Sequence, residues 1–475
     1  MKAMTLKTIA DVTNATLVVH GENVDEQQSI ISVSTDSREQ MSGQVFVALV
    51  GEKFDGHDFV KQAETNGASA IVVSRDMSVN IPQLVVDDTL EALAAIGRYQ
   101  RLKYQIPTIG LTGSCGKTTT KEMIVSILGQ SAQVHATRGN LNNQFGVPFT
   151  LFELQDSDEL SVLEMGAGHP GDIDFLTNIA LPDVVLITCI AEAHLEGMGS
   201  LEGIAATKGE IIHGLSENGT AVLPLEEKWL DDWRKKLSAN QKLLTFGLNS
   251  DADVYATNIS LWSQGMKFTM HYDNDAIDVR LPLLGEHNVQ NALAASACAI
   301  AVGYTLNQCA NGLEMVTSTA GRLTQIPGLD GSQIIDDTYN ANPKAMLAAA
   351  SVLQQYPGQH VMIVGDMAEL GPESVSIHHA LGQDLKVYAI DQLLTVGTLS
   401  AYTTEGFGAN ARHFDSKDSL IEFIQPQLNS DLVVLVKGSR SAGMEEVVQR
   451  LTDLGDAVND SGADINNGNR EVQSC

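Results

Sequence analysis

Short apolar runs alternate with helix-like segments along the first two thirds of the chain. VFVAL (45–49) and AIVVS (70–74) have the composition of buried strands and predict a small α/β unit at the N-terminus. Further along, TIGLTG (108–113), LSVLEMG (160–166) and VVLITCI (184–190) are separated by helical patterns. Strands that alternate with helices favour a parallel sheet, so this part of the chain predicts a second α/β domain.

The last third of the chain repeats this alternation with strands about 30 residues apart, the spacing of βα units in a doubly wound sheet. The predicted strands are QIIDDTY (333–339), VMIVGDM (361–367), LLTVG (393–397) and LVVLVKGS (432–439). Ligands bind such sheets at the carboxyl ends of the strands, where we expect Asp337, Asp366 and Lys437. We predict an α/β fold with domains over 1–88, 89–318 and 319–455, followed by a disordered tail over 456–475.

Composition narrows the classes of function. The 475 residues are 43% hydrophobic and 19% charged, which is enough apolar material for folded cores. Acidic residues outnumber basic ones by 59 to 29, which argues against a protein that holds nucleic acid on a basic face. The chain has no apolar run of 18 residues and no secretory signal pattern, and its five cysteines are scattered. We therefore expect a cytoplasmic protein without membrane insertion.

The most specific motif is TGSCGKTTT (112–120), which lies between a predicted strand and a predicted helix. This is the context of a phosphate-binding loop. Gly113 and Gly116 allow backbone N–H groups to surround phosphate oxygens, and the helix N-terminus adds positive charge. Lys117 can reach the β and γ phosphates, and the Thr118 hydroxyl can ligate magnesium.

Two details of the loop refine this prediction. The common GxxxxGK[ST] pattern has a glycine where this chain has Leu111, and Gly110 stands one residue early. The chain has no N-K-x-D motif, which a GTPase would normally show. At Cys115 we expect the backbone, rather than the thiol, to matter.

Seven segments in this order resemble the Mur ligase family, whose members also have the TGxxGKT form of the loop. They are TGSCGKTTTKEM (112–123), NLNNQFGVP (140–148), EMGAGHPGDI (164–173), HLEGMGS followed by TKGE (194–210), GEHNVQNALAA (285–295), GRL (321–323) and DDTYNANPKAM (336–346). The resemblance extends from about residue 30 to 450. It is greatest to the branch that adds D-alanyl-D-alanine, and the DNPR-type motif of the diamino-acid-adding branch is absent from the sequence.

The resemblance implies a reaction and a role for each domain. In this family ATP phosphorylates a peptide carboxylate, and the amine of D-Ala-D-Ala attacks the acyl phosphate, releasing ADP and phosphate. The substrates would be UDP-N-acetylmuramoyl-tripeptide and D-Ala-D-Ala, and the product a UDP-MurNAc-pentapeptide for peptidoglycan synthesis. We then expect a small N-terminal domain that binds the UDP-sugar, a central P-loop ATPase domain with a parallel sheet, and a C-terminal Rossmann-like domain, in a monomer.

The resemblance also assigns site residues. Lys117, Lys208 and His194 would be catalytic; Thr118, Glu164 and His194 would bind two magnesium ions; and Lys208 matches a lysine that is often carbamylated. The ATP site would comprise Gly113, Ser114, Cys115, Gly116, Lys117, Thr118, Thr119, Asn291, Arg322, Asp337, Asn340 and Asn342. Substrate contacts would come from Ser34, Thr35, Asp36, Ser37, Arg38, Asn142, Asn143, Lys437, Ser439 and Arg440.

Several alternatives remain open at this point. An ATP-dependent amide ligase with another acceptor, such as another Mur branch or a folylpolyglutamate-type ligase, would use the same loop. A nucleotide-binding scaffold protein without turnover is a different class, and Lys117, Glu164 and His194 argue against it. The sequence leaves open the third residue of the tripeptide, the oligomeric state and the individual roles of Asp366, Glu369 and His378.

Overall fold

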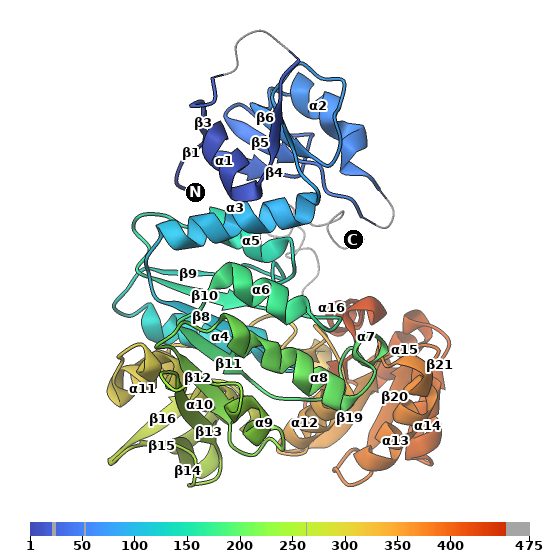
Figure 1. The fold of residues 1–475 in the computed structure, drawn as a ribbon. Coiled ribbons are helices and arrows are strands. Elements are labelled where there is room, and N and C mark those ends of the chain that lie inside the picture. The colour runs from blue at the N-terminus through green and yellow to red at the C-terminus, as the bar shows by residue number, and fades with distance from the viewer. Residues whose placement is uncertain (21–24, 52–53, 263, 453–475) are drawn as a thin grey trace.

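The computed structural model describes residues 1–20, 25–51, 54–262 and 264–452, and the predicted tail over 456–475 lies outside these ranges. Three larger sheets follow one another along the chain, one at the top of Figure 1, one in the middle and one at the lower right. The predicted α/β fold class is confirmed, with parallel pairing dominating each larger sheet.

The N-terminal sheet has, among the described residues, the strand order β2-β7-β6-β5-β4. Its strands are β2 (Thr16–Val18), β4 (Ser32–Ser34), β5 (Gln44–Val47), β6 (Ala70–Val73) and β7 (Gln83–Val85). The short strands β1 (Met4–Thr5) and β3 (Ser29–Ile30) pair beside it, and α1 (Leu6–Thr13) and α2 (Val60–Thr65) accompany it. The long helix α3 (Thr89–Lys103) connects this sheet to the middle domain (Figure 1).

The middle sheet has the order β16-β15-β14-β13-β12-β11-β8-β10-β9 over the part of the chain that is described. The strands are β8 (Thr108–Thr112), β9 (Val134–Ala136), β10 (Leu160–Glu164), β11 (Val184–Ile187), β12 (Thr220–Pro224), β13 (Lys242–Gly247), β14 (Val254–Trp262), β15 (Gly265–Tyr272) and β16 (Asp275–Leu281). The first six of these are parallel, and three of them, β8, β10 and β11, were predicted. The next strand, β14, is also parallel to β13, and β15 and β16 follow it in antiparallel pairs that the sequence did not predict.

Helices cover both faces of this sheet, which explains the continuous apolar runs of its strands. In β11, Val184 and Leu186 pack into one core with α4 (Lys117–Leu128) and α10 (Glu286–Ala301). Val185 and Ile187 point to the other core, with α6 (Asp172–Ala180) and α8 (Leu201–Lys208). The remaining helices of this domain are α5 (Gly146–Phe152), α7 (Leu195–Met198), α9 (Leu230–Arg234) and α11 (Leu306–Glu314).

The third sheet has the order β17-β18-β22-β19-β20-β21 in the described chain. Its strands are β17 (Thr324–Pro327), β18 (Gln333–Asp337), β19 (Gln359–Val364), β20 (Gln392–Val396), β21 (Ala411–Phe414) and β22 (Leu432–Lys437). They pack with α12 (Pro343–Leu353), α13 (Ser374–Leu385), α14 (Ser400–Phe407), α15 (Lys417–Ile424) and α16 (Glu445–Leu451). Only β17 is antiparallel to its neighbour, so the carboxyl ends of β18, β19 and β22 share one edge.

Candidate active site

A cavity of about 500 Å³ lies where the loop after β8 meets the carboxyl edge of the third sheet. Its walls come from both domains, and they include residues that are more than 200 positions apart in the sequence. The sequence-predicted residues that line it are Ser114, Cys115, Gly116, Lys117, Thr118, Thr119, Asn142, Asn143, Glu164, His194, Asn291, Arg322, Asp337, Asn340, Asn342 and Lys437. The fold therefore brings most of the predicted site to one place.

Backbone geometry explains the glycines of the loop. Gly116 has a φ of +78°, and a Cβ there would lie 2.4 Å from Asn291 Oδ1. Gly113 has a φ of +147°, and its Cβ would lie 2.0 Å from Thr188 Oγ1. Only glycine fits these two positions, which let the chain turn tightly from β8 into α4. The loop thus places the N-terminus of a helix at the cavity, a geometry that favours phosphate.

Lys117 and Thr118, where the loop enters α4, already have protein partners. Lys117 Nζ donates to the Gly113 carbonyl at 2.7 Å, and the Thr118 hydroxyl donates to Glu164 Oε2 at 2.9 Å. Asn142 Nδ2 donates to the other oxygen of Glu164, also at 2.9 Å. Glu164 ends β10 and points toward the loop, beside Thr118, with which the resemblance groups it as a magnesium ligand.

The donor set beside the loop fits a magnesium ion. A hydroxyl oxygen and a carboxylate oxygen lie together at Thr118 and Glu164, and Mg²⁺ is usually held by one or two such groups plus substrate phosphates. Within the described ranges no three His, Cys, Asp or Glu side chains are grouped closely enough to hold a metal ion alone. Phosphate oxygens would therefore have to complete the coordination.

His194 and Lys208 approach the cavity from the segment that follows β11. His194 Nδ1 is hydrogen-bonded to the carboxylate of Glu369, which the third domain contributes, and this contact lowers the pKa of Glu369. Lys208 is only 2% exposed, and its Nζ donates to the carbonyl of Ala167, a cavity-lining residue, at 3.4 Å. Burial, together with the charge of Lys117, lowers the pKa of Lys208 to about 7.

Arg322 connects the third domain to the loop. Its Nη2 donates to Thr118 Oγ1 at 3.0 Å, and its guanidinium carbon lies 4.2 Å from the centre of the Tyr339 ring. Its buried Nε has no hydrogen-bond partner among the described residues, and neither has the Ser114 hydroxyl. These two unpaired groups at the cavity indicate a polar ligand.

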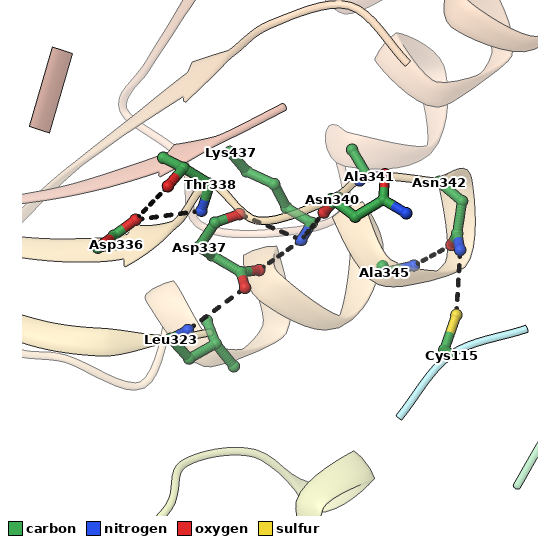
Figure 2. Close-up of polar contacts among 10 residues, drawn as sticks. All are labelled: Cys115, Leu323, Asp336, Asp337, Thr338, Asn340, Ala341, Asn342, Ala345 and Lys437. Carbon is green, nitrogen blue, oxygen red and sulfur yellow. Dashed lines mark hydrogen bonds and ion pairs between the residues drawn. The ribbon is translucent and has the colours of Figure 1, made fainter. Parts of the chain in front are cut away.

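The segment after β18 is held by a buried ion pair (Figure 2). Lys437 Nζ, at the end of β22, donates to Asp337 Oδ2 at 2.6 Å and to the Asn340 carbonyl at 2.8 Å. Asn342 follows on this segment, where its Oδ1 caps α12 by accepting from Ala345 N at 2.8 Å. Its Nδ2 donates to the Cys115 sulfur at 3.0 Å, so the thiol takes part in a contact where we expected a role for the backbone only.

Some predicted site residues lie away from this cavity. Ser34 ends β4 in the N-terminal domain, and Thr35, Asp36, Ser37 and Arg38 follow it, with Arg38 and Asp36 in an ion pair at 2.7 Å. In the third domain, Ser439 donates to the Asp366 carbonyl at 2.7 Å, and Arg440 lies 3.4 Å from Glu445. None of these residues is among those that line the cavity.

The structure gives separate environments to the three residues whose roles the sequence left open. Asp366 accepts hydrogen bonds from the backbone N–H groups of Leu399 and Ser400 and so stabilises the start of α14. His378 is fully buried and accepts from Met367 N at 3.0 Å. Glu369 alone of the three contacts a predicted catalytic residue, His194.

The sequence analysis missed several residues of the cavity. Lys344 reaches from α12 to the Ile190 carbonyl at 3.3 Å, and His287 and Cys189 also line the cavity. Lys344 and His287 stand inside segments that had been singled out, NANPKAM and GEHNVQN, so a closer inspection of those segments could have found them. No sequence signal indicated Cys189.

Together, the parallel sheet, the glycine-lysine loop at a helix N-terminus and the facing third domain define a nucleotide-binding α/β protein. Three family descriptions match successive parts of the chain. They are "Mur ligase family, catalytic domain" over residues 29–101, "Mur ligase middle domain" over 111–299 and "Mur ligase, glutamate ligase domain" over 321–440.

Curated relatives match over nearly the full length. UDP-N-acetylmuramoyl-tripeptide–D-alanyl-D-alanine ligase of Escherichia coli (strain K12) is 41% identical over 96% of this chain and 100% of the relative. The ligase of the same name from Bacillus subtilis (strain 168) is 36% identical, over 94% of this chain and 98% of the relative.

Solved structures give the same result. MurF from Acinetobacter baumannii superimposes with a TM-score of 0.89 at 39% identity, over 95% of this chain and 99% of that one. MurF ligase from Thermotoga maritima in complex with ADP gives a TM-score of 0.81 at 30% identity, over 88% and 96% of the two chains. The chain belongs to the Mur ligase family.

Proposed function

We propose that this protein is the ATP-dependent ligase that joins D-alanyl-D-alanine to UDP-N-acetylmuramoyl-tripeptide. Three relatives bearing this name share 36–42% identity with it over at least nine tenths of the chain. A folylpolyglutamate synthase of Mycobacterium tuberculosis is only 18% identical, a level at which the likeness concerns the fold alone. The comparisons therefore favour this branch over the other amide ligases.

The observation that carries the proposal is the meeting of the phosphate loop with Arg322 of the third domain. A carboxylate is a poor electrophile, so it must be activated before an amine can form an amide with it. Phosphoryl transfer depends mainly on positioning and on neutralising negative charge. Lys117 and Arg322 place two cations around the triphosphate, and the adjacent third domain brings the amine to the activated carboxylate.

Magnesium would be held by Thr118 and Glu164, and it would polarise the transferred phosphoryl group and neutralise its charge. A second ion would be placed by His194, whose Nδ1 is fixed by Glu369 and whose Nε2 then remains for the metal. Lys208, with a pKa lowered to about 7, has a large fraction of neutral amine near neutral pH. Only a neutral amine can take up CO₂, so this environment supports the carbamylation of Lys208.

The remaining substrate contacts follow from the arrangement of the domains. The UDP end of the nucleotide-sugar would be bound by residues 34–38 of the N-terminal domain, and its peptide would extend toward Asn142 and Asn143. Ser439 and Arg440 would receive D-Ala-D-Ala at the edge of the third sheet. Among the described residues no helix is long and apolar enough to cross a bilayer. We propose a cytoplasmic monomer with these domains over 1–88, 89–318 and 319–455.

The proposal is tested by measuring phosphate release with ATP and magnesium while each acceptor is omitted in turn. We expect release only when UDP-MurNAc-tripeptide and D-Ala-D-Ala are both present, and a product mass equal to that of the pentapeptide. Glutamate or a diamino acid in place of the dipeptide tests the other ligase branches. Nucleotide binding without turnover in any combination would indicate a scaffold protein and refute the proposal.

A further inference from the structure

Two cysteines from distant parts of the sequence lie together at the edge of the cavity. Cys115 is in the phosphate loop, Cys189 follows β11, and both are half-buried and line the cavity. The backbones are bonded next to them, since Ser114 N donates to the Cys189 carbonyl at 2.9 Å. The Cys189 sulfur lies 3.7 Å from the Cys115 carbonyl, so its side chain packs directly against Cys115. The two thiols are thus close enough to react with each other.

The surroundings of the two sulfurs differ in a way that gives each a separate role. The Cys115 sulfur accepts hydrogen bonds from the Cys189 thiol and from Asn342, and it lies near the cations Lys117 and Lys344. These contacts lower the pKa of Cys115 although burial opposes them. The same hydrogen bond, with burial, raises the pKa of Cys189. The pair therefore consists of one thiolate-forming sulfur and one protonated neighbour.

The protein contains a second cysteine pair that serves as an internal comparison. Cys298 and Cys309 are fully buried in the core of the middle domain, between α10 and α11. Burial raises the pKa of both thiols, that of Cys309 to about 12. Thiols that are buried and protonated are inert. Both pairs are close, so the pair at the cavity is distinguished by its partly exposed position and by the lowered pKa of Cys115.

We propose that Cys115 and Cys189 form a reversible disulfide by exchange with small disulfides of the glutathione class. The Cys115 thiolate attacks one sulfur of the small disulfide and displaces the first thiolate, which takes up a proton. Cys189 then loses its proton and attacks the Cys115 sulfur of the mixed disulfide, displacing the second thiolate. The protein loses two protons and two electrons in total, and the small disulfide takes them up and is reduced to two thiols.

The disulfide would act on the nucleotide site, and this consequence rests on the proposed function. A Cys115 sulfur bonded to Cys189 loses its negative charge and its position against Asn342, which comes from the third domain. It also ties the loop to the end of β11. Because small displacements in a binding site can cost large factors, we expect ATP affinity to fall by roughly tenfold or more.

The test uses the full chain with Cys475→Ser, which removes the thiol outside the described residues. We expect oxidised glutathione to produce a species lighter by two hydrogens, with peptide mapping placing the bond between Cys115 and Cys189 while Cys298 and Cys309 stay free. With Cys189→Ala the reaction should stop at one glutathionyl group on Cys115. With Cys115→Ser neither product should form, and excess ATP with magnesium should slow the reaction of the parent chain.

Nucleotide binding is measured on the same samples before and after oxidation and again after reduction with dithiothreitol. Lower affinity that reduction restores would support the effect on the loop. The proposed disulfide would be overturned by any of three results in the parent chain: a stable mixed disulfide, no reaction, or equal reaction of Cys298 and Cys309. An unchanged affinity would overturn its effect on the site. The masses do not depend on ligase activity, so failure of the proposed function would be recognised separately by the phosphate-release assay.

Discussion

Replacing Lys208 with methionine should stabilise the protein, although the proposed function makes this lysine catalytic. The ammonium group is buried, and among the described residues it donates one hydrogen bond, to the Ala167 carbonyl at 3.4 Å. Among the described residues no carboxylate lies within 4.0 Å of it, and Asp172 and Glu210 act only from a greater distance. Methionine keeps most of the aliphatic stem and removes the charge that is costly to bury.

The size of the effect follows from the pKa of Lys208. Burial lowers this pKa from 10.5 to about 7 in the folded protein. At a pH between these values the unfolded chain holds the proton and the folded chain does not, so stability rises with pH. The loss of stability from the buried Lys208 charge is greatest below about pH 7, and it disappears above the pKa that the lysine has in the unfolded chain. At about 1.4 kcal/mol per pH unit, it falls from about 4 kcal/mol at pH 7 to about 2 kcal/mol at pH 9.

The assay compares the free energy of unfolding of the middle domain in the parent chain and in Lys208→Met at these two pH values. Buffers are freed of CO₂ so that the amine stays unmodified, and Lys267→Met, at an exposed strand position, is the control. We expect the advantage of Lys208→Met to shrink as pH rises, while the control shows no such trend. If Lys208→Met is less stable at both pH values, or if its advantage does not change with pH, the reasoning is refuted.

Bicarbonate extends this experiment to the proposed carbamate. Carbamylation replaces a buried cation with an anion, which the charge of Lys117 and bound magnesium would favour. We expect bicarbonate with magnesium to stabilise the parent chain and to leave Lys208→Met unaffected. An equal response of both chains would mean that the ligand binds elsewhere.

Three further predictions concern the loop and the segment that faces it. Lys117→Ala should abolish phosphate release while nucleotide binding, measured by calorimetry, is weakened but still detectable. Lys437→Met should lower the free energy of unfolding by about 3 kcal/mol because it leaves buried Asp337 without its partner, and adding Asp337→Asn should recover part of this loss. Asn342→Ala should lower the free energy of unfolding by about 1 kcal/mol through the lost helix cap. Asn342→Asp should keep the cap and lose only the donor to Cys115. Thermal unfolding reports the loss of the cap, and ATP affinity reports the loss of the donor.

The sequence predicted most of the parallel strands because they are buried on both faces. Their apolar runs are continuous, as in VVLI of β11. The antiparallel strands β14, β15 and β16 escaped prediction because one face of each is largely exposed and carries polar residues. Their apolar positions alternate with polar ones, and this weaker pattern did not stand out beside the helices.

Individual site residues could be predicted, but most of their contacts could not. Thr118 and Glu164 were paired correctly because a loop and a strand end of one parallel sheet must meet at the same edge. In contrast, the contact between Asn342 and Cys115 joins residues 227 positions apart, one before α12 and the other in the loop after β8. It depends on how the two domains pack, which no local pattern of residues records.

The packing of the middle and third domains also determines which hydrogen bonds a triphosphate must replace in order to bind. Lys117 and Arg322 both donate to protein acceptors, the Gly113 carbonyl and the Thr118 hydroxyl. When a phosphate oxygen binds, each of these cations therefore exchanges a protein acceptor for a phosphate acceptor. The net gain in binding free energy from exchanging one neutral acceptor for another would be small. The gain must come from charge, since an anionic oxygen is a better acceptor for a cation than a carbonyl or hydroxyl. Arg322 delivers its charge from the third domain, so the binding of the triphosphate and the docking of that domain onto the loop must strengthen each other.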